Sequence, residues 1–365
     1  MFALTIHGRK IPTAAMKQGS AIHQTLEDQV HETFEVSPKT KEDAFGLRIW
    51  NVIQGLRTLD DIGMTRELEV WGSIEGQVVN GVIDEISFTV PDEELEKTDK
   101  ARNGNFLAGQ MKAIESFKSP AEKSIGSASH TKKRLTQSQK VYVCDVKTRG
   151  ISGLPRGAAF RPAKIQLMVY HRLLSKMATG KVDLSAILKR YALNGVTPFT
   201  DSFIAQIGGL GDDGVDSTPS SSLQESVSPQ DLGSSPPESS RVTLDLLLAH
   251  NSISKLWALM LRDFRRVLPN GTASIGNILR AEYRARADGS LIGSNLFPMD
   301  DALLDAYLAH AMKLWRGERD PEGVAVEEAY KCRSCEFADA CDWRRERAAA
   351  GRMQKAWGPS GPAFD

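Results

Sequence analysis

The feature that most constrains the fold is a pair of apolar stretches that each carry an acidic residue where a strand is expected. Residues 81–84 read GVID, and residues 141–148 read VYVCDVKT. Because side chains alternate along a strand, Asp145 and Lys147 point to one face of the second stretch and Cys144 points to the other. Charges without partners are costly to bury. The two stretches therefore predict strands with a polar site at their ends.

Two acids and a lysine at strand ends have the chemistry of metal-assisted phosphodiester hydrolysis. Carboxylates such as Asp84 and Asp145 hold Mg²⁺ through hard oxygen ligands. The metal polarises the phosphate and lowers the pKa of an attacking water. Lys147 can orient that water or stabilise the developing charge. In a chain with 46 acidic residues a D-x-K triplet alone says little, and its place inside an apolar strand is what favours catalysis.

Hydrophobic periodicity predicts alternating helices and strands along the chain. Helices are predicted at 17–36, 42–60, 162–178, 243–267 and 300–316. Strands are predicted as a pair within 66–90, at 141–148, as one or two short strands within 189–207, and as a hairpin at 276–297 that turns near Asp288 and Gly289. No run of about 18 apolar residues exists, so we expect no membrane-spanning helix and no membrane partner. No G-x-x-x-x-G-K-[ST] phosphate loop exists either, which excludes a motor ATPase.

Two polar segments interrupt this pattern. Residues 91–140 read as a polar, partly disordered insert, and residues 211–240 read as a disordered Ser/Pro-rich acidic linker. The predicted organisation is therefore a first part of the core at 1–210, the linker, and the helical and hairpin remainder of the core at 241–331. A cysteine segment and tail at 332–365 complete the chain.

Net charge excludes a histone-like, wholly basic protein, because 46 basic residues balance 46 acidic ones. A local basic groove is still compatible with this balance. One basic group comprises Lys132, Lys133, Arg134, Lys140, Arg149, Arg156, Arg161 and Lys164, and a second comprises Arg262, Arg265, Arg266, Arg280, Arg284 and Arg286. Such groups either hold nucleic-acid phosphates or cover solvated helix faces.

The four cysteines are too few for a disulfide-stapled fold. Three of them, Cys332, Cys335 and Cys341, have the spacing C-x₂-C-x₅-C. Soft thiolates this close together bind zinc or an iron–sulfur cluster. The C-terminal segment is therefore predicted to be a metal site.

Two pairs of polar residues at helical spacing complete a series of four motifs along the chain. His23 and Glu27 are four residues apart, as are Gln166 and Tyr170, and either pair alone reads as an ordinary polar stripe. In order, G-x-x-x-H-x-x-x-E, GVID, DVKTR and Q-x-x-x-Y resemble the RecB-type branch of the PD-(D/E)XK nucleases. This resemblance implies Mg²⁺ or Mn²⁺ ligands and a catalytic set. The implied metal ligands are His23, Asp84 and Asp145, and the implied catalytic residues are Asp84, Asp145, Lys147, Gln166 and Tyr170, the last two shaping the active site and the DNA path.

The C-terminal part is similar to that of the eukaryotic exonuclease V family. The similar stretches are KIQLMVYHRLL at 164–174, WRGER at 315–319, and EEAYKCRSCEF with CDWR within 327–344. The resemblance implies an α/β fold: a PD-(D/E)XK restriction-endonuclease-like core with a mixed central sheet flanked by helices, closed by a C-terminal iron–sulfur segment. It also implies a [4Fe–4S] cluster on Cys332, Cys335, Cys341 and a fourth cysteine upstream of the first helix. Because no cysteine precedes Cys144, we expect that fourth ligand to be absent from this chain and the start to be truncated.

The implied function is that of a metal-dependent exonuclease that hydrolyses single-stranded DNA from strand ends. The family acts in DNA repair or genome maintenance in the nucleus or mitochondrion, so we expect single-stranded DNA as substrate, a monomer, and a single-strand DNA-binding protein as partner. Two alternatives stay open from the sequence. One is a RecB-like nuclease that acts as an endonuclease or on RNA, and the other is a DNA-binding or scaffold protein impaired by a missing N-terminal part.

Overall fold

The computed structural model describes residues 14–30, 36–99, 101, 139–209, 238–335 and 337–356. The chain divides into two compact units. The larger unit comprises Met1–Leu154 and Leu167–Met299, and the smaller comprises Pro155–Gln166 and Asp300–Asp365. The four-part division that the sequence favours stays a prediction.

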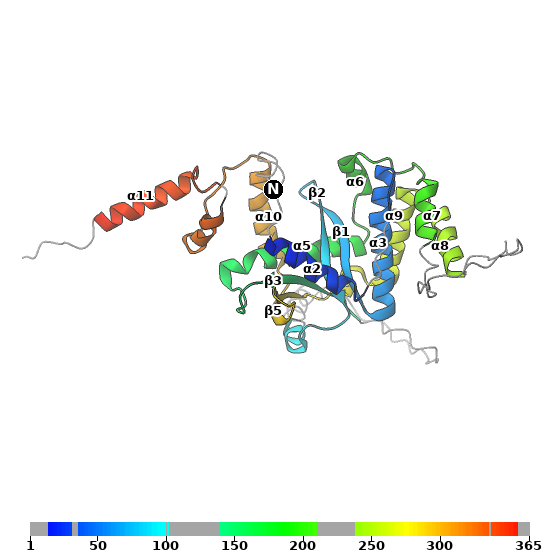
Figure 1. The fold of residues 1–365 in the computed structure, drawn as a ribbon, viewed down its shortest axis with the longest axis horizontal. Helices are drawn as coiled ribbons and strands as arrows, with labels where there is room; N and C mark the ends of the chain where they lie inside the picture. Colours follow the sequence, from blue (N-terminus) through cyan, green and yellow to red (C-terminus); the bar gives the residue numbers. More distant parts are fainter. Residues whose placement is uncertain are drawn as a thin grey trace, which may run out of the picture. The chain divides into compact units, whose positions relative to one another are not determined.

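A five-stranded mixed sheet forms the centre of the larger unit in the described residues (Figure 1). The strands lie in the order β1 (Met64–Ile74), β2 (Gln77–Ser87), β3 (Tyr142–Arg149), β4 (Ile278–Ala285) and β5 (Leu291–Pro298). All neighbours are antiparallel except β3 and β4, which are parallel. The predicted strand pair at 66–90, the strand at 141–148 and the hairpin at 276–297 are confirmed, as is the predicted α/β fold with a mixed central sheet.

Helices flank this sheet and continue into the smaller unit. They are α2 (Ala14–Glu27), α3 (Lys41–Ile62), α5 (Arg161–Ala178), α6 (Leu184–Tyr191), α7 (Asp201–Gly209), α8 (Glu238–Ala249), α9 (Ile253–Val267), α10 (Asp301–Trp315) and α11 (Asp342–Ala356). Short 3₁₀ turns lie at Gly157–Ala159, Gly271–Ser274 and Val326–Ser334. None of the helices in the described part of the chain is both long and apolar enough to cross a membrane.

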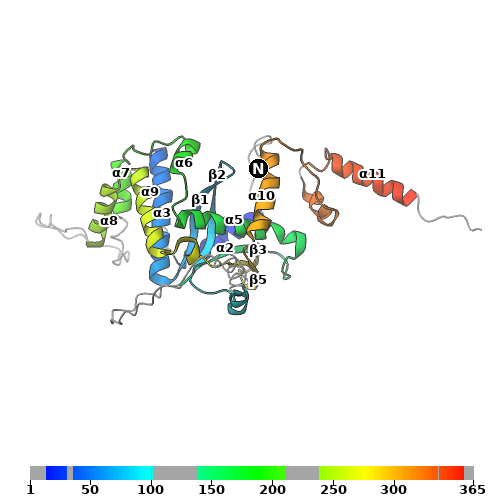
Figure 2. The same cartoon turned by 180° about the vertical axis from the view of Figure 1, so that it is seen from behind.

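Helix α3 shows how local sequence fixes the framework. Thr40 and Asp43 form a capping box at its start, and Gly63 ends it in the left-handed conformation that glycine tolerates. The helix buries Ile49, Ile53 and other apolar side chains while packing against α9 and β1. Figure 2 shows the same elements from behind, with α5 crossing β1 and β2.

The prediction of strands within 189–207 is wrong, because this region forms α6 and α7. Asp183 caps α6 by accepting a hydrogen bond from the Ser185 N–H. In α7, Phe203, Ile204 and Ile207 are buried at helical spacing. Burial of this helical face outweighs the strand propensity of the β-branched and aromatic residues here.

Three boundaries also need correction. The predicted helix 17–36 ends at Glu27, with a turn over 28–30, and residues 31–35 lie outside the described residues. The predicted helix 243–267 is two helices, since the chain leaves α8 after Ala249 and Ser252 is the N-cap of α9. The predicted linker 211–240 ends too late, because α8 begins at Glu238. Residues 211–237 of the linker lie outside the described residues. In the predicted insert 91–140, residues 93–99 form a helix, and residues 102–138 lie outside the described residues.

Candidate active site

Strand register brings the predicted acids and lysine together. Glu85 of β2 pairs with Cys144 of β3 in an antiparallel ladder, which places Asp84 beside Asp145. The Asp84 carboxylate accepts a 2.6 Å hydrogen bond from the Val146 N–H, and the Lys147 ammonium donates one of 2.8 Å to Asp145 Oδ1. Asp145 is fully buried, whereas the Asp84 side chain is 12% exposed. The two acids and the lysine therefore form one compact group.

Helix α2 adds His23 to this group. The helix packs on β3 through Leu26 and Ile22, which contact Cys144 and Val146.

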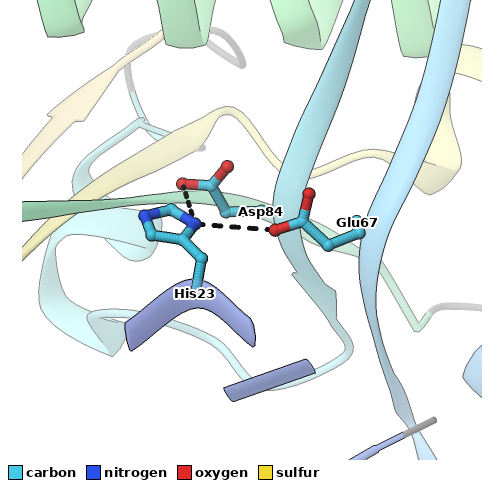
Figure 3. A group of neighbouring side chains, drawn as sticks. All are labelled: His23, Glu67 and Asp84. Carbon is cyan, nitrogen blue, oxygen red and sulfur yellow. Dashed lines mark ion pairs between the residues drawn. The ribbon is translucent and has the colours of Figure 1, made fainter. Parts of the chain in front are cut away.

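Its Gly19 lies so close to Thr148 that an added Cβ would come within 3.0 Å of the hydroxyl oxygen. The glycine in the G-x-x-x-H pattern therefore permits the close approach that positions the histidine. His23 Nδ1 lies 3.5 Å from Glu67 Oε1 and 3.9 Å from Asp84 Oδ2 (Figure 3).

Tyr170 of α5 lies over the first residue of the GVID strand. A Cβ at Gly81 would come within 2.5 Å of the Tyr170 ring, so only glycine accommodates the ring there. The tyrosine also contributes to the electrostatic environment of Lys147. Gln166 lies one helical turn earlier on α5. The Q-x-x-x-Y pattern therefore places Tyr170 next to the acids.

The site concentrates negative charge in a buried place. Burial, followed by the charge of Asp145, raises the pKa of Asp84 to about 7. Burial also raises the pKa of Asp145, against the opposing effect of Lys147. Burial alone would lower the pKa of Lys147, but the charge of Asp145 and the hydrogen bond to it raise the pKa overall. The lysine is thus held in its charged form.

One buried oxygen in this group has the properties of a cation ligand. Oδ2 of Asp145 is buried and has no hydrogen-bond partner among the described residues. Buried carboxylate oxygens normally have hydrogen-bond partners, and a divalent cation such as Mg²⁺ binds hard oxygen ligands of this kind. The residues present therefore fit the metal that the sequence predicts.

Glu67 is a site residue that sequence reasoning missed. One ligand atom from each of His23, Glu67 and Asp84 lies within 4.8 Å of the others. The hydrogen bond that His23 makes with Glu67 raises the pKa of the imidazole, against the effect of burial. Glu67 lies in β1 with φ of 51°, a left-handed conformation that costs an ordinary residue roughly 1–2 kcal/mol. Hydrophobic periodicity gives no sign of this conformation.

Tyr283 of β4 was also missed. It pairs in register with Lys147, and it lies close enough to Asp145 for that charge to raise its pKa, after the larger effect of burial. The Arg149 guanidinium lies 5.6 Å from the centre of its ring. The parallel pairing of β3 with β4, which brings Tyr283 to the site, could not be read from the sequence.

The cysteines lie in two different settings. Cys332 is in the turn Val326–Ser334, Cys335 directly follows it, and Cys341 precedes α11, all in the smaller unit. Their convergence on one cluster stays a prediction. Cys144 is buried against α2, and burial raises the pKa of its thiol to about 12 although Arg280 Nε donates to the sulfur at 3.1 Å. Such a raised pKa opposes the thiolate form that metal ligation requires.

The structure assigns ion-pair partners to only some of the basic residues that the sequence singles out. Arg280 forms an ion pair with Glu85, and Arg266 forms one with Asp60. Lys132, Lys133 and Arg134 lie outside the described residues. A phosphate-binding groove thus stays a prediction.

Comparisons with known proteins give one consistent result. The profile of a family described as exonuclease V, a 5′ deoxyribonuclease, matches residues 1–344. Over 351 residues the chain is 22% identical to exonuclease V of Danio rerio, and the matched region covers 96% of this chain and 67% of that protein. Over 68 residues it is 31% identical to the mitochondrial exonuclease V of Candida dubliniensis, covering 19% of this chain and 11% of that protein. The family match includes every predicted site residue and all three clustered cysteines.

Proposed function

Since the chain belongs to the exonuclease V family of DNA exonucleases, we propose that it hydrolyses single-stranded DNA from strand ends with Mg²⁺ or Mn²⁺. The observation that carries the metal dependence is the buried, unpartnered Oδ2 of Asp145 beside Asp84. His23, Asp84 and Asp145 would hold the ion. When bound, it supplies Lewis-acid activation of the phosphate and acidifies the attacking water.

The protein's own contribution rests on Lys147. Its ammonium is fixed by Asp145 at 2.8 Å and stays charged, because its pKa is raised. A positioned cation stabilises the negative charge that develops on phosphate oxygens during hydrolysis. Tyr170 packs over Gly81, in the strand that carries Asp84. We assign Gln166 and Tyr170 to positioning the DNA strand.

Other parts of the proposal depend on the family and its members. The family description names a 5′ deoxyribonuclease, so we propose attack from 5′ ends. The Candida dubliniensis relative is named mitochondrial, which supports a mitochondrial role in genome maintenance, with DNA repair and a nuclear location as further parts of the proposal. Cys332, Cys335 and Cys341 would ligate a [4Fe–4S] cluster, and a monomer would work with a single-strand DNA-binding protein.

The test compares cleavage and binding in two lysine variants. Lys147→Ala should abolish Mg²⁺-dependent degradation of end-labelled single strands while leaving single-strand binding largely intact, because binding comes from distributed phosphate contacts. Lys97→Ala removes an exposed lysine that pairs with Glu94, and it should leave both properties unchanged. Near-normal turnover in Lys147→Ala would contradict its assigned role.

Substrate choice separates the alternatives. Cleavage of circular single strands would indicate an endonuclease, and preference for RNA would indicate a different substrate class. Binding without any Mg²⁺-dependent cleavage by the wild-type protein would indicate a DNA-binding or scaffold protein.

A further inference from the structure

We propose that Glu67 is a further metal ligand of this centre, and that His23, Glu67 and Asp84 together form one cation position. The inference rests on the proposed function, because it assigns an additional side chain to the same metal centre. It extends the set of His23, Asp84 and Asp145 that the sequence predicts.

The first argument is the backbone of Glu67. In the ladder between β1 and β2, Arg66 pairs with Glu85 and Leu68 pairs with Ile83, so Glu67 lies opposite Asp84. Glu67 interrupts an otherwise extended strand with φ of 51°. A non-glycine residue held in this region inside a strand is strained, and such strain concentrates at functional sites.

The second argument is distance. Ligand atoms bound to one Mg²⁺ ion lie about 2.0–2.1 Å from it, so two of them on opposite sides are at most about 4.2 Å apart. The ligand atoms of His23, Glu67 and Asp84 all lie within 4.8 Å of one another. In Figure 3 both dashed lines start at Nδ1 of the imidazole and run to the two carboxylates, and each of the three residues comes from a different element. The three side chains can therefore share one ion with only small movements.

The competing explanation is that Glu67 only orients His23 by accepting a hydrogen bond from Nδ1. Glu67→Gln distinguishes the two roles, because glutamine keeps a side-chain oxygen acceptor but loses the charge. A positioning role survives this change, whereas a ligand role does not.

The experiment is calorimetric titration of Mn²⁺ into the metal-free protein of residues 1–365 without DNA. Glu67→Gln and Glu67→Gly should each weaken Mn²⁺ binding at least about 10-fold, the scale on which ligand-shell changes act. Glu67→Gly should also melt at the same or a higher temperature, because glycine relieves the left-handed strain. Retained stability would show that weaker binding does not come from unfolding.

The matched control uses the other left-handed glutamate of the same hairpin. Glu75 has φ of 46° and lies in the turn between β1 and β2, where Ile74 pairs with Gln77. Glu75→Gly should relieve comparable strain and leave Mn²⁺ affinity unchanged.

Unchanged Mn²⁺ affinity in Glu67→Gln would overturn the assignment. If only Glu67→Gly then lost affinity, Glu67 would be a positioning partner of His23. Failure of the proposed function looks different, because the wild-type protein would then bind no Mn²⁺ at all. Binding that Asp84→Ala abolishes and Glu67→Gln leaves intact would reject the Glu67 inference alone.

Discussion

Replacing Asp84 by asparagine should stabilise the metal-free protein at alkaline pH and much less at acidic pH. Asparagine keeps an oxygen that can accept the Val146 N–H, but it carries no charge. The pKa of Asp84 rises from 3.8 to about 7 on folding. Between these values the folded protein retains a proton that the unfolded chain releases, so wild-type stability falls as pH rises from about 4 to 7.

The size of the effect follows from that difference in pKa. Each pH unit between the unfolded and folded pKa is worth about 1.4 kcal/mol, which gives about 4 kcal/mol for Asp84 when it is fully ionised. This is an upper limit, because the side chain is 12% exposed and keeps part of its hydration. A gain of roughly 2–4 kcal/mol corresponds to a Tm increase of roughly 3–5 °C in a chain of this size, because the entropy of unfolding is about 2.1 cal/mol/K per residue.

Calorimetric melting in EDTA from pH 5 to pH 8.5 measures this directly. The Tm difference between Asp84→Asn and wild type should be small at pH 5 and should grow until about pH 7.5. Asp61→Asn, at an exposed position in the last turn of α3, should shift Tm equally at pH 6 and pH 8. A Tm difference for Asp84→Asn that does not change with pH would refute the reasoning.

Two further predictions concern parts of the chain away from the acids. Replacing 212–236 by a short Gly/Ser linker should change Tm and cleavage little, since loop-closure entropy varies slowly with length; loss of folding would show that this segment packs. Glu328→Gln should lower the iron retained per protein, because buried Glu328 pairs with Arg161 and belongs to the turn that carries Cys332. Glu318→Gln, which loses an exposed pair, is its control, and equal iron contents in the two variants would contradict this role.

The acids and lysine could be predicted because strand periodicity and residue type report them directly. A charged residue inside VYVCDVKT is conspicuous in any apolar strand, and Gly81 and Gly19 mark places where side chains approach the backbone closely. The sequence also indicated the element types of the sheet. It did not indicate that β3 pairs with β4 in parallel, which requires contacts across more than a hundred residues.

The failure at 189–207 has a long-range cause. Asp43 at the start of α3 accepts hydrogen bonds from the N–H and the hydroxyl of Thr200. Phe199 packs so closely on Gly46 that a Cβ there would come within 2.5 Å of its ring. These contacts fix the start of α7 from a helix far away in the sequence, so local propensity could not predict it.

Glu67 could have been found from the turn between β1 and β2. The predicted strand pair within 66–90 leaves the register of the two strands open. A two-residue turn at Glu75–Gly76, with both residues at positive φ, is a hairpin type whose length fixes the register. Counting back from Ile74 opposite Gln77 then places Glu67 opposite Asp84. The signal was therefore in the length of the turn, because register rather than composition decides which side chain lies next to a predicted metal ligand.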